Sequence, residues 1–439
     1  MVALEWNAQN SRPDKELPPE IKTILEEERL AQKNALTLAY KDERASLQLP
    51  FETEFLKNCS VLAEQHKDMK ALFLIGIGGS NLGTVAVIEA LQGKMHNELR
   101  DKKVYFADTC DSEDLADMHS LMKSFLDKGE KVLINVISKS GGTTETLTNF
   151  SVLEDCLLSY KDKFPNIFSQ IVATTEKDSK LYNYAKGKGY SCLEMPSSVG
   201  GRYSVLSTVG LFPLCLMDVN CKELLEGAKE MAEFCLEEQD PRKNPAMALS
   251  AALYEQKQEN KISIVNSFFF LSRLESLGKW YRQLLAESTG KEKNRKGDIV
   301  HSGYTPTTCI GSTDLHSIAQ LHLGGPNDTF HSFIRVANLR KVQVPDNKEL
   351  EAIVHHTSNR PVSEILDAIY IGIREAFLEK KRPLSEIVLN EVSEKSLGAY
   401  MQLMMMEVMY LGALEGINPF DQPNVEDYKV ITKKELEQR

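Results

Sequence analysis

The chain has 439 residues, more than a single hydrophobic core usually serves, so two domains are the starting expectation. Hydrophobic residues make up 42% of it and charged residues 26%, a balance that excludes an intrinsically disordered chain. The formal net charge of −11 argues against a nucleic acid or an anionic membrane as the main partner, although a small anion can still bind in a locally positive pocket.

Cysteine and histidine patterns predict no metal and no cofactor. The eight cysteines are scattered without a CxxC pair, so neither a zinc ribbon nor a dithiol redox motif is indicated. No HExxH motif occurs, and His355 and His356 lack a third ligand at metal-binding spacing. Free thiols fit a reducing compartment, and residues 1–20 lack the apolar stretch of a secretory signal, so we expect a cytoplasmic protein.

The N-terminal part predicts a helical arm and then an α/β domain. Residues 1–47 form the expected arm, because Pro18 to Arg44 is rich in Glu, Lys, Ala and Leu. From residue 48 to 240, short apolar runs alternate with helix-like stretches, which favours a parallel sheet wrapped by helices. The predicted strands are Ala71 to Ile75, Val104 to Ala107, Val132 to Ile137 and Ile171 to Thr174.

A second α/β domain is predicted over residues 241–439, after turn residues at Asp240 to Asn244. Its expected strands begin near Ile262 and cover Phe330 to Val336 and Ile387 to Val392; its expected helices are Leu274 to Glu287, Val362 to Glu379 and Ser396 to Gly416. The apolar segment from Leu397 to Ile417 contains Gln402, Glu407 and Glu415. A membrane span carries few such groups, so we expect a buried core helix.

Gly76 to Gly83 (GIGGSNLG) is a glycine-rich segment between a predicted strand and a predicted helix. Glycines let backbone N–H groups approach an anion at a helix N-terminus, where the helix dipole also favours negative charge. Asn81 stands where a dinucleotide fingerprint needs glycine, and no Walker A Gly-Lys-Ser/Thr follows. A phosphate site is the hypothesis, and a tight turn without a ligand is its alternative.

Ser138 to Thr146 (SKSGGTTET) is a second loop of this kind, again directly after a predicted strand. Its hydroxyl groups, glycines and Lys139 supply many donors at a helix start, as a phosphate monoester requires. The alternative is an ordinary helix cap with spare hydroxyl groups.

Further along the chain, four residues are candidates for catalysis. Arg202 follows two glycines, and its permanently charged guanidinium suits a developing oxyanion. Glu287 ends an apolar-faced helix beside a turn of small residues, His316 lies in the segment GSTDLHS, and Lys429 ends the segment PFDQPNVEDYK. Taken singly, each is more simply read as a surface residue.

Together and in this order, these segments closely resemble the phosphoglucose isomerase family, of its short bacterial type, from about Leu49 to Lys429. The resemblance implies two sugar isomerase (SIS) domains with flavodoxin-like, doubly wound parallel sheets, flanking helices and helical N- and C-terminal extensions. It also implies a homodimer with shared active sites, a sugar phosphate substrate and no cofactor.

The resemblance assigns roles by motif match. The implied substrate-binding residues are Gly79, Ser80, Ser138, Lys139, Ser140, Thr143, Gly201 and Gln422, and the implied catalytic residues are Arg202, Glu287, His316 and Lys429. Glu287 is then the base that carries a proton between C2 and C1 of an opened sugar, while Arg202 stabilises the enediolate oxygen. His316, supplied by the neighbouring subunit, and Lys429 assist ring opening.

Two other readings share the fold. An isomerase for another phosphosugar is disfavoured by the combination of Glu287, His316 and Lys429. A non-catalytic SIS module that senses sugar phosphates would keep the hydroxyl-rich loops and dispense with the base. A purely structural or secreted role has no positive feature in the sequence.

Overall fold

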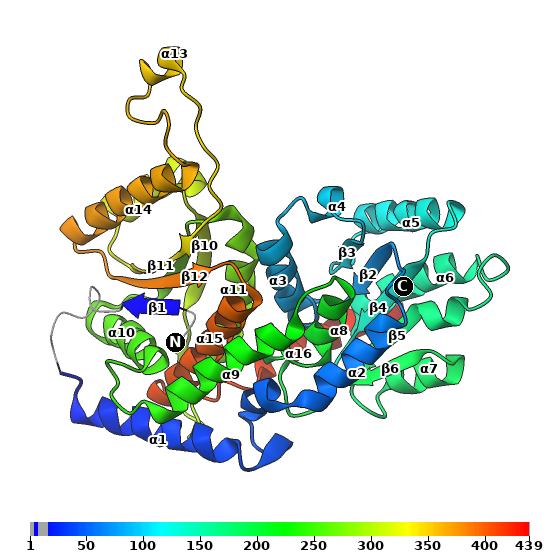
Figure 1. Cartoon of the computed structure of the whole chain (residues 1–439). Helices are drawn as coiled ribbons and strands as arrows, with labels where there is room; N and C mark the ends of the chain where they lie inside the picture. Colours follow the sequence, from blue (N-terminus) through cyan, green and yellow to red (C-terminus); the bar gives the residue numbers. More distant parts are fainter. Residues whose placement is uncertain (1–3, 8–15, 439) are drawn as a thin grey trace.

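The computed structural model describes residues 4–7 and 16–438 and contains two five-stranded sheets side by side, joined by a layer of helices (Figure 1). The first sheet is wholly parallel and has the order β3-β2-β4-β5-β6. Its strands are β2 (Ala71–Ile75), β3 (Lys103–Ala107), β4 (Val132–Ile137), β5 (Ile171–Thr175) and β6 (Ser191–Glu194). This is the flavodoxin-like order, so the predicted fold class is confirmed, although β6 was not predicted.

The second sheet repeats the first four places of this order and then differs at its edge. Its order is β10-β7-β11-β12-β1, in which β1 alone runs antiparallel and pairs Leu4 with Leu389. Its strands are β7 (Ile264–Phe269), β10 (Thr305–Ile310), β11 (Thr329–Asn338), β12 (Leu384–Glu391) and β1 (Leu4–Asn7). The prediction of a wholly helical arm over residues 1–47 is therefore incomplete, because Leu4–Asn7 belong to this sheet.

Helices cover both sheets and fill the space between them. In the part of the chain that contains the first sheet, the helices are α2 (Thr53–Glu64), α3 (Leu82–Gln92), α4 (His96–Leu99), α5 (Ser112–Asp127), α6 (Thr144–Leu158), α7 (Lys180–Lys188) and α8 (Thr208–Leu216). The others are α1 (Pro19–Ala35), α9 (Cys221–Glu237), α10 (Pro245–Asn260), α11 (Glu275–Thr289), α12 (Ala319–Gly324), α13 (Lys348–Glu351), α14 (Val362–Glu379), α15 (Glu394–Leu414) and α16 (Glu426–Gln438). A short hairpin of β8 (Lys291–Lys293) and β9 (Ile299–Ser302) follows α11.

Helix α15 lies at the centre of the molecule, in contact with α9, α10 and α11 (Figure 1). Within the described ranges it is the one helix long and apolar enough to cross a membrane, but 94% of that stretch is buried inside the protein. The prediction of a buried core helix is confirmed.

The main hydrophobic core runs without interruption from one sheet to the other. It includes Leu72 and Leu133 of the first sheet and Val265 and Ile334 of the second. The expected boundary at Asp240 to Asn244 corresponds to the connection between α9 and α10. The two sheets thus hold their edges in a fixed relation, which matters for a site built from both.

Candidate active site

The first element of the site is a contact between two glycine turns. The turn η4 (Gly78–Ser80), which follows β2, lies against the turn η6 (Gly201–Tyr203). A Cβ atom added to Gly79 would lie 2.2 Å from the carbonyl carbon of Gly201 and 2.6 Å from the backbone nitrogen of Arg202. Only glycine permits this approach. The contact brings Gly79, Ser80 and Gly201 together beside Arg202.

The hydroxyl-rich loop after β4 lies at the same edge, because β4 pairs with β2 in the parallel sheet. Thr143 precedes α6, yet its side chain does not cap that helix. Its hydroxyl instead lies 3.0 Å from the hydroxyl of Ser138, while the exposed Ser140 accepts a weak hydrogen bond from the Gly142 N–H at 3.4 Å. The hydroxyl groups of Ser138 and Thr143 therefore face each other, and that of Thr143 is not used to cap the helix.

Lys139 ties this loop to the electrostatics of Arg202. Burial lowers the pKa of Lys139, and the positive charge of Arg202 acts in the same direction, while Glu176, 3.7 Å away, opposes it. Two cations in one partly buried place favour an anionic ligand.

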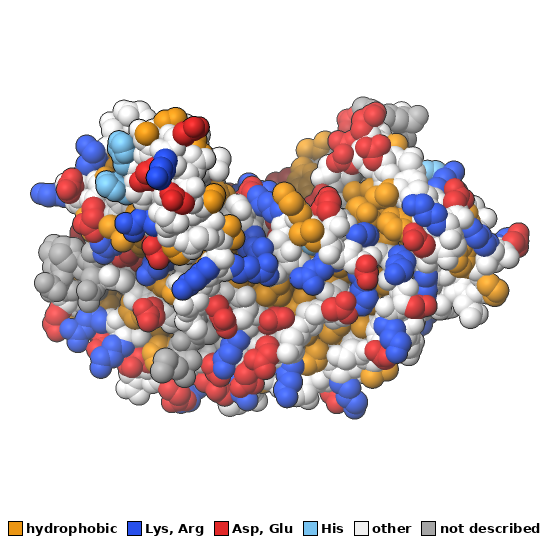
Figure 2. Space-filling model, turned by 45° about the horizontal axis from the view of Figure 1, so that its top comes forward, with side chains coloured by type: hydrophobic (Ala, Val, Ile, Leu, Met, Phe, Trp, Pro, Cys, Tyr) orange, Lys and Arg blue, Asp and Glu red, His pale blue; other side chains and the backbone are white. Residues whose placement is uncertain are grey.

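On the surface of Figure 2 acidic and basic side chains are interspersed, so the net charge of −11 does not make a uniformly acidic face.

Arg202 is the centre of a buried polar network. Its side chain is fully buried, and its Nη1 atom lies 3.2 Å from the Oε2 atom of Glu287 and 2.6 Å from the Oε1 atom of Gln422. Its Nε and Nη2 atoms donate to the hydroxyl of Ser288 at 2.9 Å and to the carbonyl of Pro419 at 2.5 Å. Hydrogen bonds to Ser288, Gln422 and Pro419 thus fix the guanidinium, which also pairs with the carboxylate of Glu287.

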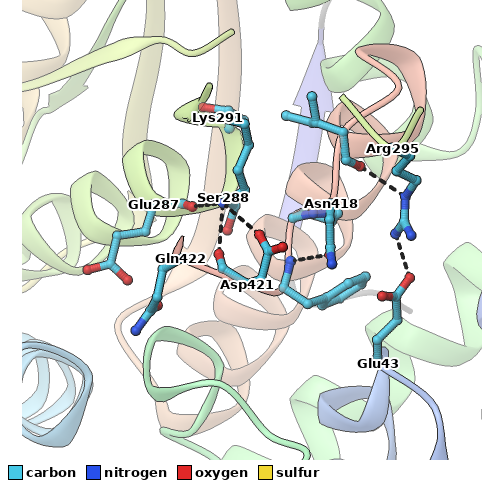
Figure 3. Close-up of polar contacts among 12 residues, drawn as sticks. Glu43, Glu287, Ser288, Lys291, Arg295, Asn418, Asp421 and Gln422 are labelled. Carbon is cyan, nitrogen blue, oxygen red and sulfur yellow. Dashed lines mark hydrogen bonds and ion pairs between the residues drawn. The ribbon is translucent and has the colours of Figure 1, made fainter. Parts of the chain in front are cut away.

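Glu287 comes from the last turn of α11 and keeps 31% of its side chain exposed. Its Oε1 atom accepts a hydrogen bond from the Nε2 atom of Gln283, one helical turn earlier, at 3.1 Å. Figure 3 shows the Glu287 carboxylate and the Gln422 amide on the same side of the cluster. A carboxylate held at both oxygens, yet open to solvent, is suited to accept and return a proton.

The side chain of Lys291 ends between the backbone of Glu287 and that of Asp421 (Figure 3). It is buried, and its Nζ atom donates to the backbone carbonyls of Glu287 at 2.5 Å and Asp421 at 2.8 Å. Burial lowers the pKa of Lys291 to about 8, helped by the charge of Arg202 and opposed by Asp421. The contact joins the end of α11 to the segment that carries Gln422.

A family model described as phosphoglucose isomerase matches residues 51–439. The chain belongs to the phosphoglucose isomerase family. Among relatives of this family, the glucose-6-phosphate isomerase of Carboxydothermus hydrogenoformans is 34% identical over 406 residues, which are 89% of this chain and 84% of that one. A probable glucose-6-phosphate isomerase of Methanococcus maripaludis is 34% identical over 84% of this chain and 79% of its own.

Two solved structures share the fold of this chain. A hypothetical protein of Thermus thermophilus has a TM-score of 0.85, with 29% identity and 99% of each chain covered. A glucose-6-phosphate isomerase of Chlamydia trachomatis has a TM-score of 0.71 at 22% identity, over 98% of this chain and 77% of that one. The latter likeness concerns the fold alone.

Within this phosphoglucose isomerase fold, the structure does not bring His316 to Glu287. His316 is exposed in the turn η8 (Thr313–His316) after β10, while α11 begins after the neighbouring strand β7. His316 and the start of α11 therefore both lie at the carboxyl edge of the second sheet. Glu287 is near the opposite end of α11, roughly 18 Å along the helix axis at 1.5 Å per residue.

Lys429 also lies apart from the Arg202 network. It is on α16, a helix with no buried side chain, and its Nζ atom lies 2.6 Å from the Oε1 atom of Glu426. Among the described residues no hydrogen bond or ion pair joins Lys429 to Glu287 or Arg202.

Gln283 and Lys291 are members of the network that the sequence analysis missed. Gln283 had a usable signal, because a residue four places before Glu287 shares its helix face. Lys291 had none, since the stretch that it begins, Lys291 to Lys296, is strongly basic and resembles an ordinary solvated loop.

Proposed function

We propose that the protein catalyses the reversible isomerisation of D-glucose 6-phosphate and D-fructose 6-phosphate, with Glu287 as the base. The observation that carries this proposal is the Glu287 carboxylate held 3.2 Å from the buried Arg202 guanidinium and 3.1 Å from the Gln283 amide. Family membership supports the substrate, since relatives carry the name glucose-6-phosphate isomerase.

In the proposed mechanism, Glu287 removes the C2 proton of the open-chain sugar and returns it to C1, while the hydroxyl proton moves from O2 to O1. The intermediate is a cis-enediolate, and Arg202 stabilises its oxygen because a guanidinium stays protonated at all working pH values. A proton transfer between neighbouring carbons needs neither a redox cofactor nor a metal ion. Gln283 and Gln422 keep the carboxylate and the guanidinium in place.

The proposed phosphate grip is at the edge of the first sheet, away from the reacting carbons. Ser138, Ser140 and Thr143 donate hydroxyl groups, and Ser80 contributes from the neighbouring turn. Gly79, Lys139 and Gly201 complete the same edge. Binding energy gained there orients C1 and C2 against Glu287.

We further propose a homodimer in which His316 completes the site of the partner. Two observations support this: His316 lies at the carboxyl edge of the second sheet, where α11 begins, whereas Glu287 lies near the end of α11, and His316 is exposed in a single chain. Ring opening by His316 then requires a second copy. Lys429 acts in the same step, and α16, which buries no side chain of its own, has a free surface for such contacts.

Eight free cysteines support a cytoplasmic location for the enzyme, where thiols stay reduced. Neither a nucleic acid nor a membrane is needed for the proposed reaction.

The test is a coupled assay of the purified protein with fructose 6-phosphate, repeated for Glu287→Gln. We expect measurable turnover in the parent and a loss of roughly a hundredfold to ten-thousandfold in the variant, the usual contribution of a positioned base. Affinity for the sugar phosphate stays within a few-fold, and exchange of the C2 hydrogen with heavy water falls in parallel with turnover. Glu287→Asp, which keeps a carboxylate, retains more activity than Glu287→Gln.

The matched control is Glu275→Gln, at the other end of α11, where the carboxylate pairs with Lys94 and Lys279. It keeps parental activity. Near-parental turnover and exchange in Glu287→Gln contradict the assignment of the base. Binding of the sugar phosphate without any turnover in the parent favours the sensor module instead.

A further inference from the structure

Cys215 and Cys221 hold their sulfur atoms 3.5 Å apart, at the end of α8 and the start of α9. The turn between them is fixed from outside. Lys102 donates to the carbonyl of Leu216 at 3.0 Å and pairs with Asp218 at 2.6 Å. The proximity of the two thiols is therefore built into the fold.

The two thiols differ in access to solvent. Cys215 is partly exposed, whereas Cys221 is only 2% exposed. Both line an open groove of about 300 Å³ that also includes Ser60 and three lysines, which are Lys67, Lys102 and Lys222. A small oxidant that enters this groove meets the partly exposed Cys215 more readily than the nearly buried Cys221.

Hydrogen bonding separates the acidities of the pair. The contact with Cys221 lowers the pKa of Cys215, and the Ser60 hydroxyl, 3.8 Å from its sulfur, acts in the same direction against the effect of burial. The same contact, together with burial, raises the pKa of Cys221. Cys215 is thus the more acidic thiol of the pair and Cys221 the less acidic one, and the thiolate is the form that reacts.

We propose that Cys215 and Cys221 form a redox-active dithiol that small hydroperoxides oxidise reversibly to a disulfide. The Cys215 thiolate attacks a peroxide oxygen, so that an S–O bond forms, the O–O bond breaks and the leaving alkoxide or hydroxide takes up a proton. Cys221 then attacks the Cys215 sulfur, the S–S bond forms, and hydroxide leaves with the thiol proton of Cys221 as water. The dithiol gives up two electrons, which reduce the peroxide to an alcohol, or water, and a second water.

The pair needs only a small movement to close. A disulfide bond is about 2.05 Å long, so the two sulfur atoms must approach by roughly 1.5 Å. The bond would tie the end of α8 to the start of α9. Within the described ranges, neither sulfur contacts Arg202 or Glu287, so this pair is separate from the proposed active site.

The experiment treats the purified full-length protein with a small excess of hydrogen peroxide and then blocks free thiols by alkylation. Residues 203–222 form one tryptic peptide that contains both cysteines and no other. We expect this peptide to lose two hydrogens and both alkylation sites, and to regain them after dithiothreitol. The exposed Cys110, which follows β3, is the internal reference and should react about tenfold more slowly, because among the described residues no second thiol lies in contact with its sulfur.

Two variants identify the roles. Cys221→Ser should stop the reaction at a Cys215 sulfenic acid that dimedone traps, while Cys110→Ser should leave the disulfide unchanged. The proposal is overturned if Cys110 is oxidised before Cys215, if Cys215 of the parent proceeds to sulfinic acid without a disulfide, or if Cys215 pairs with the buried Cys59.

Discussion

The two sheets share the order of their first four strands but use their carboxyl edges differently. In the first sheet the loops after β2 and β4 meet at one edge, beside the η6 turn and Arg202. In the second sheet the chain after β7 enters α11 and carries Glu287 away to the opposite end, while His316 stays at the carboxyl edge. A repeated fold therefore does not imply a repeated arrangement: the first edge gathers the glycine turns and Arg202, whereas the second leaves His316 exposed and apart from Glu287.

The largest effect is expected from mixing two inactive chains. If the second edge serves a partner's site, combining His316→Ala with Glu287→Gln chains gives heterodimers with one intact site each. Activity then rises from near zero to about a quarter of the parental value for random pairing in a dimer. The measurement is the coupled assay before and after subunit exchange. Persistent inactivity after verified exchange would mean that the second edge does not serve a neighbouring subunit.

A second test disrupts the contact between Gly79 and Gly201, where the two glycine turns of the first sheet's edge come closest together. Gly79→Ala places a Cβ atom 2.2 Å from the backbone of Gly201, so the two turns must separate and move Arg202. We expect a loss of about a hundredfold or more in kcat/KM, because a misplacement of about 1 Å can cost that much. Gly187→Ala in α7 is the control, since a Cβ atom there meets nothing within 4 Å. Equal activity of both variants would show that the glycine contact does not set the site.

The hydroxyl-rich loop of the first edge should give a smaller effect. Thr143→Val keeps the shape of the side chain but removes a donor to the phosphate, at a cost of roughly 1.5 to 3 kcal/mol, or about ten- to a hundredfold in affinity. Titration calorimetry with 6-phosphogluconate measures it. Thr23→Val, at an exposed position of α1, is the control. Unchanged binding by Thr143→Val would remove this loop from the phosphate site.

The last test concerns stability, with no loss of activity expected, and it addresses the helices α11 and α15 between the two sheets. Tyr281 of α11 donates to the Oε2 atom of the buried Glu407 of α15 at 2.7 Å, and burial raises the pKa of Glu407 to about 7. The folded state thus binds this proton more tightly than the unfolded state. The protonated Glu407 therefore adds roughly 3 kcal/mol to the unfolding free energy. This stabilisation is complete below about pH 4.5 and is lost as the pH rises through 7.

Glu407→Gln should flatten the dependence of the unfolding free energy on pH between about 4.5 and 7, measured by urea unfolding. Glu20→Gln, exposed on α1, should leave the slope unchanged. An unaltered slope in Glu407→Gln would mean that this carboxyl group does not titrate within that range.

Much of the first sheet could be predicted from the sequence, because its central strands are short, mostly apolar runs bounded by polar or glycine-containing turns. Ala71–Ile75 and Val132–Ile137 were predicted with their observed bounds. The strand Thr305–Ile310 (TPTTCI) was missed because its residues are mostly polar and include proline. The strand Leu4–Asn7 was missed because its partner lies at the other end of the chain.

The candidate site was less accessible to sequence reasoning. Nothing in the spacing of Arg202 and Glu287 indicates that their side chains meet, and only the resemblance to a family suggested it. The structure adds the reason: η4, η6 and α11 pack on one another, which fixes both groups. The resemblance placed Lys429 in the site, whereas in a single chain this residue lies on an exposed helix.

The pairing of β1 with β12 has a consequence for the order of folding. Leu4 is synthesised long before Leu389, so β1 can pair in the sheet only after β12 has been made. Until β12 is made, β1 lacks its partner, and unpaired strand edges invite aggregation in a growing chain. Contacts between residues so distant in sequence form slowly, because a long loop must close first. The second sheet is therefore completed later in synthesis than the first, whose last strand, β6, ends at Glu194.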